Sequence, residues 1–79
     1  MRVTMYTTDW CGDCDRAKKF LNQKDILFDE INIEHSENAL EQLVQWTGGK
    51  HIVPTFDIEG KIMLNPPIRE LAAALDVPY

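Results

Sequence analysis

The chain has 79 residues, of which 44% are hydrophobic and 27% charged, and its formal net charge is −5. A chain of this length buries only about 60% of its unfolded surface, so we expect one domain over residues 1–79. The acidic balance disfavours nucleic-acid binding. We see no signal segment and no run of ~18 apolar residues, and therefore expect a soluble cytoplasmic protein that does not contact membranes.

The first part of the chain predicts a strand followed by a helix. Residues 3–6 are mostly apolar and precede the polar residues 7–9, which is typical of a short strand that runs into a loop. Apolar residues then recur at three- and four-residue steps, which predicts an amphipathic helix over residues 12–23. These positions are Cys14, Ala17, Phe20 and Leu21.

The middle of the chain predicts a second strand and a second helix. Residues 26–33 have the apolar density of a strand, although their alternation is imperfect. Ser36 offers an N-cap to the helix that follows, and Gly48-Gly49 ends it. We expect Phe28, Ile31 and Ile33 to face inward from the strand, and Leu40, Leu43, Val44 and Thr47 to form one face of the helix.

The last third predicts a hairpin and a closing helix. Residues 55–58 and 61–64 are short strands around Glu59-Gly60, a two-residue turn typical of hairpins. Pro66-Pro67 opens a helix with apolar positions Ile68, Leu71, Ala72 and Leu75. The order βαβαββα predicts an α/β protein with a thioredoxin fold, in which three helices flank a four-stranded mixed sheet.

The Cys11-Gly12-Asp13-Cys14 motif lies between the first strand and the first helix. The start of a helix stabilises a thiolate through its unpaired N–H groups and its dipole, which favours Cys11 as the exposed nucleophile. Cys14 lies one turn further on, where a buried thiol resolves a mixed disulfide. Gly12 leaves room for the sulfur of a partner.

Charged residues around the motif have opposite effects on the pKa of the Cys11 thiol. Acidic neighbours raise the pKa of a thiol by like-charge repulsion, and basic neighbours lower it. The acidic ones are Asp9, Asp13 and Asp15, and the basic ones are Arg16, Lys18 and Lys19. We expect moderate activation of Cys11, mainly from the helix terminus. We also expect Asp13 to favour the disulfide and so to make the protein a stronger reductant.

Two other interpretations of the cysteines stay open. The pair could form a structural disulfide or two buried apolar side chains, although structural disulfides are rare in the cytosol. Together with His35 and His51, the cysteines could also bind zinc, but the spacings differ from those of zinc fingers. His51 is otherwise a polar loop residue.

Trp10 and Val53-Pro54 are candidate substrate-binding residues. Trp10 is predicted to be an exposed apolar surface for a partner peptide, with packing on the flank of the domain as the alternative. Trp46 is interpreted as structural. Pro54 marks the start of a strand, where a cis bond would leave the Val53 N–H and C=O free to pair with an extended partner.

These residues together resemble the glutaredoxin family, over essentially the whole chain. The resemblance rests on residues 10–14, on Val53-Pro54 before the third strand and on the hairpin that contains Gly60. Within the family the chain is similar to the mycoredoxins and related short bacterial proteins. The shared segments are Thr7-Thr8, Ile33-Glu34-His35, Gly48-Gly49 and Asn65-Pro66.

The resemblance implies reduction of mixed disulfides between proteins and a low-molecular-weight thiol, either glutathione or mycothiol. It implies no tightly bound cofactor, and it implies that Val53 holds the cysteinyl backbone of the small thiol. Glutathione-dependent members usually carry a lysine at the position of Thr8, and a Gly-Gly with an acidic pair where residues 64–67 lie. Redoxins that serve ribonucleotide reductase usually carry Trp-Ser-Gly-Phe where this chain has residues 62–67.

We therefore expect a monomeric dithiol oxidoreductase that acts on disulfide-containing proteins through Cys11 and Cys14. One alternative is a thioredoxin-like electron carrier that a flavoprotein such as thioredoxin reductase reduces. Another is a metal or iron–sulfur carrier, in which two chains share a cluster through Cys11 and small thiols.

Overall fold

The structure is a computed structural model that describes residues 2–79. It contains four strands and three helices in the predicted order. They are β1 (Val3–Thr7), α1 (Gly12–Gln23), β2 (Asp29–Asn32), α2 (Glu37–Thr47), β3 (Thr55–Ile58), β4 (Lys61–Leu64) and α3 (Ile68–Leu75). No helix in this part of the chain is long and apolar enough to span a membrane.

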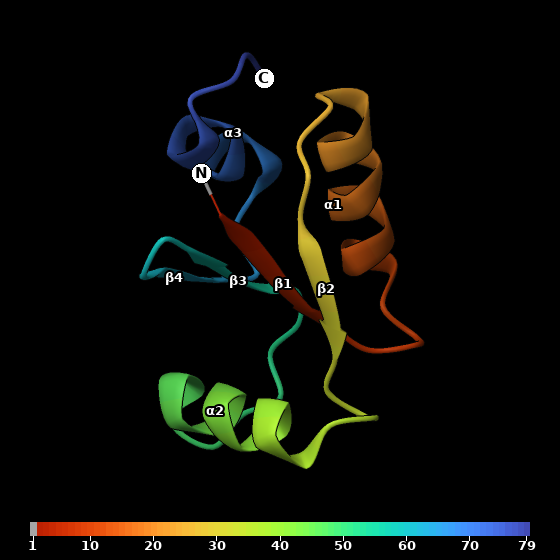
Figure 1. The fold of residues 1–79 in the computed structure, drawn as a ribbon, viewed down its shortest axis with the longest axis vertical. Coiled ribbons are helices and arrows are strands. Elements are labelled where there is room, and N and C mark those ends of the chain that lie inside the picture. The colour runs from red at the N-terminus through yellow and green to blue at the C-terminus, as the bar shows by residue number, and fades with distance from the viewer. Residues whose placement is uncertain (1) are drawn as a thin grey trace.

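The four strands form one mixed sheet in the order β2-β1-β3-β4. The pair β1 and β2 is parallel, whereas β3 runs antiparallel to both β1 and β4. The predicted thioredoxin fold is thereby confirmed (Figure 1). Because β1 and β2 are parallel, the loops that follow them leave the same end of the sheet. That end carries the motif with both cysteines.

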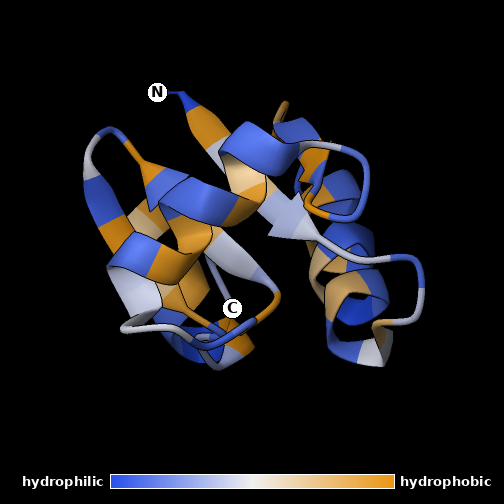
Figure 2. Cartoon of the chain, turned by 90° about the horizontal axis from the view of Figure 1, so that it is seen from below, coloured by the Kyte–Doolittle hydropathy of each residue, from blue (hydrophilic) through white to orange (hydrophobic). Residues whose placement is uncertain are grey.

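Each face of the sheet has its own hydrophobic core. Helices α1 and α3 cover one face and α2 covers the other (Figure 1). The larger core joins β1, α1, β3 and α3, and it includes Met5, Cys14, Leu21, Phe56 and Leu71. The smaller core consists of Tyr6, Ile33, Ala39 and Leu43. The helices carry hydrophobic and hydrophilic bands side by side (Figure 2), as expected for helices with one buried face.

Tyr6 and Trp46 extend the smaller core. Their rings meet edge to face with centroids 5.3 Å apart, which confirms a structural role for Trp46. Burial, and to a lesser extent the Asp57 carboxylate, raises the pKa of Tyr6 above its ordinary value of 10.0. The phenol is therefore neutral in the physiological range.

Two sequence predictions need correction. The second strand is Asp29–Asn32 rather than residues 26–33, because only these residues pair with β1. Phe28 packs against the larger core, while Ile31 and Ile33 pack in the smaller one. This division between the two faces explains the imperfect alternation. In α2, Ala39, Leu40, Leu43 and Trp46 form the packed face. The prediction had placed Val44 and Thr47 there.

Local signals fix the ends of α2 and the hairpin. The Ser36 hydroxyl accepts a hydrogen bond from the Ala39 N–H at 3.2 Å, which confirms the predicted N-cap. Gly48 ends the helix with φ +74°, a left-handed conformation that glycine adopts at little cost. Glu59 and Gly60 both have positive φ, as the two-residue turn between β3 and β4 requires.

We expect Ser36→Ala to lower the free energy of unfolding by about 1 kcal/mol, because the Ala39 N–H loses its acceptor. Ser36→Asp keeps a capping oxygen and adds negative charge at the helix N-terminus, so it should retain wild-type stability within about 0.5 kcal/mol. Urea unfolding followed by circular dichroism measures both changes. Equal stability of all three proteins would show that this cap contributes nothing.

Candidate active site

Cys11 is the last residue of the loop that connects β1 to α1, and it is the N-cap residue of that helix. Its backbone is extended, with φ −123° and ψ 103°, and its carbonyl accepts from the Asp15 N–H at 3.2 Å. The Cys11 Sγ accepts a hydrogen bond from the Cys14 N–H at 3.0 Å. The sulfur therefore occupies the place of a capping oxygen, where the helix dipole favours negative charge.

The two cysteines form a disulfide, with Cα atoms 5.1 Å apart. Cys14 is only 1% exposed and belongs to the larger core, whereas Cys11 packs at the edge of that core and is partly exposed. Cys11 is thus less exposed than the sequence analysis assumed. A partner can still reach only one of the two sulfurs without disturbing the core.

Trp10 and Gly12 flank Cys11 in the sequence. The Trp10 side chain is 92% exposed, which excludes packing on the flank of the domain. Gly12 is exposed too, and a Cβ built there would meet no atom within 4 Å. No atom of residues 2–79 therefore requires glycine at this position.

Val53 and Pro54 directly precede β3, and the peptide bond between them is cis. Val53 packs against the same core as Cys11, and Pro54 is buried. Within residues 2–79, neither the N–H nor the C=O of Val53 makes a hydrogen bond. The neighbouring backbone is held, because the Pro54 carbonyl accepts from the Asn65 N–H at 2.8 Å and the Thr55 hydroxyl donates to the Ile52 carbonyl at 2.8 Å.

The charged side chains of the first turn of α1 are largely paired. Asp13 forms an ion pair with Arg16 and accepts from the Asn65 side-chain amide at 3.4 Å. Lys18 pairs with Glu30 at 2.9 Å and with Asp15 at 3.9 Å. Of the three cations that the sequence places around the motif, Arg16 and Lys18 are therefore engaged by carboxylates, whereas Lys19 makes no ion pair within residues 2–79.

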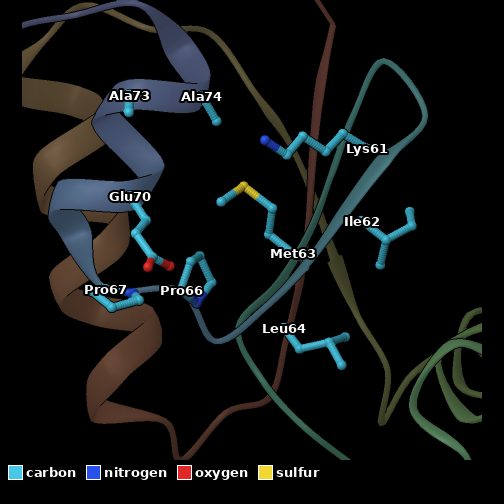
Figure 3. Close-up of a pocket in the computed structure, with 9 residues that line it drawn as sticks. All are labelled: Lys61, Ile62, Met63, Leu64, Pro66, Pro67, Glu70, Ala73 and Ala74. Carbon is cyan, nitrogen blue, oxygen red and sulfur yellow. The ribbon is translucent and has the colours of Figure 1, made fainter.

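Two hollows adjoin this region. A cavity of about 260 Å³ is lined by Asp13, Arg16, Pro54 and Asn65 together with Ala17 and residues 66–68. A groove of about 540 Å³ lies between β4 and α3, with Met63 and Glu70 among its lining residues (Figure 3). Pro66 and Pro67 line both hollows.

Sequence reasoning missed several residues near the site. Asn65 had been noticed only as part of a shared segment, and Asn32 had not been singled out. The Asp9 carboxylate accepts from Asn32 and contacts His35, and is thus engaged away from the cysteines. His51 is exposed. Within residues 2–79, no three His, Cys, Asp or Glu side chains are grouped so that they could hold a metal ion.

The chain is similar to known glutaredoxins in sequence and in structure. The Glutaredoxin family model matches residues 3–63. A protein of Mycobacterium tuberculosis named as a glutaredoxin is 40% identical over 74 residues, which cover 92% of this chain and 88% of that protein. Mycoredoxin 1 of Corynebacterium glutamicum is 33% identical over 75 residues, with coverages of 94% and 92%.

Among solved structures, the buckwheat glutaredoxin–glutathione complex matches with a TM-score of 0.72 and 25% identity, covering 94% of this chain and 72% of that chain. The family match extends over most of the sequence, and the C-x-x-C pair lies at the helix start as a disulfide. The chain therefore belongs to the glutaredoxin family and is a thiol–disulfide oxidoreductase.

Proposed function

We propose that the protein reduces mixed disulfides between proteins and a low-molecular-weight thiol, with Cys11 as the nucleophile and Cys14 as the resolving thiol. The observation that supports these roles is the asymmetry of the pair. Cys11 Sγ caps α1 and is partly exposed, whereas Cys14 is 1% exposed. A thiolate at a helix N-terminus is stabilised and accessible, while a buried thiol reacts only within the molecule.

The proposed reaction has two exchange steps. The Cys11 thiolate attacks one sulfur of the mixed disulfide, forms a new S–S bond with it, and the other sulfur leaves as a thiolate. The Cys14 sulfur, after losing its proton, attacks Cys11 Sγ and expels the first sulfur as a second thiolate. The substrate gains two electrons, and the protein ends with the Cys11–Cys14 disulfide. A reduced small thiol or a reductase then restores the dithiol.

Binding of the substrate is assigned to Trp10, Gly12, Val53 and Pro54. The unpaired N–H and C=O of Val53 can pair with an extended backbone, such as the cysteinyl part of a small thiol. Gly12 leaves space for the attacked sulfur, and the exposed Trp10 indole offers a flat surface to the protein partner.

For the small thiol we propose mycothiol rather than glutathione. Arg16, the cation among the side chains lining the cavity, is paired with Asp13, and Thr8 stands where glutathione-dependent glutaredoxins usually carry lysine. The free carboxylates of glutathione would find little charge to meet them here. The similarity to mycoredoxin 1 supports the same choice. We further propose that the protein acts in the cytoplasm as a single-domain monomer.

Cys11→Ser should abolish disulfide reduction, because no thiolate remains at the helix start. Cys14→Ser should keep the first step and accumulate a mixed disulfide with the small thiol, which mass spectrometry of the unreduced protein detects. Full turnover by the Cys11→Ser protein would contradict the assignment of the nucleophile.

Three coupled assays identify the reductant by NADPH consumption. They contain mycothiol with its reductase, glutathione with its reductase, and thioredoxin reductase alone. We expect turnover with mycothiol at least tenfold faster than with glutathione, for the electrostatic reason given above. Equal rates would overturn the choice of thiol, and turnover only with thioredoxin reductase would make the protein a thioredoxin-like carrier.

Substitutions that remove the charge of Asp13 or of Arg16 should shift the reduction potential in opposite directions. Asp13→Asn removes a charge that repels the Cys11 thiolate, which stabilises the reduced form and raises the potential. Arg16→Gln leaves the Asp13 carboxylate without its partner cation and therefore lowers the reduction potential. Interactions between exposed charges contribute about 0.2–1 kcal/mol and about 30 mV corresponds to 1.4 kcal/mol, so shifts of roughly 4–20 mV are expected. Thiol–disulfide titration measures them, and shifts of the same sign would contradict this electrostatic explanation.

A further inference from the structure

The segment between β1 and Cys11 is tied to the turn between β2 and α2 by a closed set of hydrogen bonds. The Asp9 carboxylate accepts from the Asn32 side-chain amide at 2.6 Å, and the Asp9 N–H donates to the Glu34 carboxylate at 2.9 Å. The Glu34 N–H in turn donates to the Asn32 side-chain oxygen at 2.9 Å. We call Asp9, Asn32 and Glu34 the loop clamp.

The loop clamp continues the pairing of the two parallel strands. Thr7 and Asn32 are the last register partners of β1 and β2, and the Ile33 N–H donates to the Thr7 carbonyl at 2.9 Å. Beyond that point the backbones separate, and side chains take over the connection. Two of the three bonds involve a carboxylate, and such charge-assisted hydrogen bonds are roughly twice as strong as neutral ones.

Trp10 lies directly after the loop clamp and has no anchor of its own. Its side chain is 92% exposed, and within residues 2–79 it makes no hydrogen bond or ring contact. Cys11 differs, because its carbonyl and its sulfur are both bonded to α1. The helix therefore holds Cys11 on one side of Trp10, and the loop clamp holds Asp9 on the other.

We propose that Asp9 is a positioning residue, which acts with Asn32 and Glu34 to keep the Trp10 indole beside Cys11 Sγ for contact with a protein partner. The proposal rests on the function proposed above, in which Trp10 contacts that partner. It predicts that breaking the loop clamp impairs reaction with proteins and leaves the intrinsic reactivity of Cys11 unchanged.

The experiment compares Asp9→Ala with Asp9→Asn. An asparagine at position 9 still accepts the hydrogen bond from Asn32 but has lost the charge. Three quantities are measured: the rate of insulin disulfide reduction driven by dithiothreitol, the rate of Cys11 alkylation by iodoacetamide, and the fluorescence anisotropy of Trp10. For the anisotropy, all proteins carry Trp46→Phe, so that Trp10 is the reporting indole.

We expect Asp9→Ala to slow insulin reduction about tenfold and to lower the Trp10 anisotropy, while alkylation changes less than twofold. Asp9→Asn should stay within about threefold of the wild-type rate. Asp57→Ala is the matched control, because it removes a carboxylate that accepts from the Gly60 N–H at 2.8 Å in the distant hairpin. Glu34→Ala breaks the loop clamp from the other side and serves if Asp9→Ala unfolds.

Unchanged insulin reduction and anisotropy in Asp9→Ala and Glu34→Ala would overturn the proposal. Equal losses of the insulin reduction rate in Asp9→Asn and Asp9→Ala would overturn it too. The negative charge of Asp9, and not its hydrogen bond with Asn32, would then determine the rate. Trp10→Ala distinguishes a failure of the proposed role of Trp10 from a failure of the proposed role of the loop clamp. If it reduces insulin at the wild-type rate, the proposed role of Trp10 fails; if it is slow while Asp9→Ala is not, only the loop clamp fails.

Discussion

The hydrogen bond from the Cys14 N–H to Cys11 Sγ connects the reactive sulfur to the first turn of α1, and the remainder of the site is arranged around that connection. The bond gives the sulfur the position of an N-cap, where unpaired N–H groups and the helix dipole favour a thiolate. The same turn carries the Cys14 side chain into the core. One local structure therefore provides both an accessible sulfur and a buried one.

The sheet supports this arrangement from both sides. Cys14 packs with residues of β1, β3 and α3, so any shift of the first turn of α1 would disturb the larger core. Val53 packs against that core from the loop before β3, and within residues 2–79 its backbone N–H and C=O make no hydrogen bond. On the opposite side, the loop clamp fastens the approach to Cys11 to the end of β2. Helix, core and loop clamp thus hold different parts of the site.

Local patterns were sufficient to predict most of the fold. The three- and four-residue steps gave residues 12–23 as a helix, and Glu59-Gly60 between apolar runs gave the hairpin with its observed bounds. The strand at residues 26–33 was predicted too long, because apolar residues that serve two different cores look like one continuous run. Periodicity cannot tell which core a side chain enters.

The position of the cysteine pair at the start of α1 and the cis bond before Pro54 could likewise be predicted, since the spacing of the cysteines and the restricted chemistry of proline are local properties. The side-chain contacts around them could not. Asp9 and Asn32 are 23 positions apart, and Asn65 and Asp13 are 52 positions apart. Such contacts follow from the register of β1 with β2 and from the return of the chain after β4, which no local pattern encodes.

Selective labelling tests the asymmetry of the two sulfurs most directly. The fully reduced protein is treated with less than one equivalent of iodoacetamide at neutral pH, and the label is located by mass spectrometry of its peptides. Nearly all of the label is expected on Cys11, because its sulfur caps α1 and is accessible while Cys14 is buried. Equal labelling of both cysteines, or a preference for Cys14, would contradict this expectation.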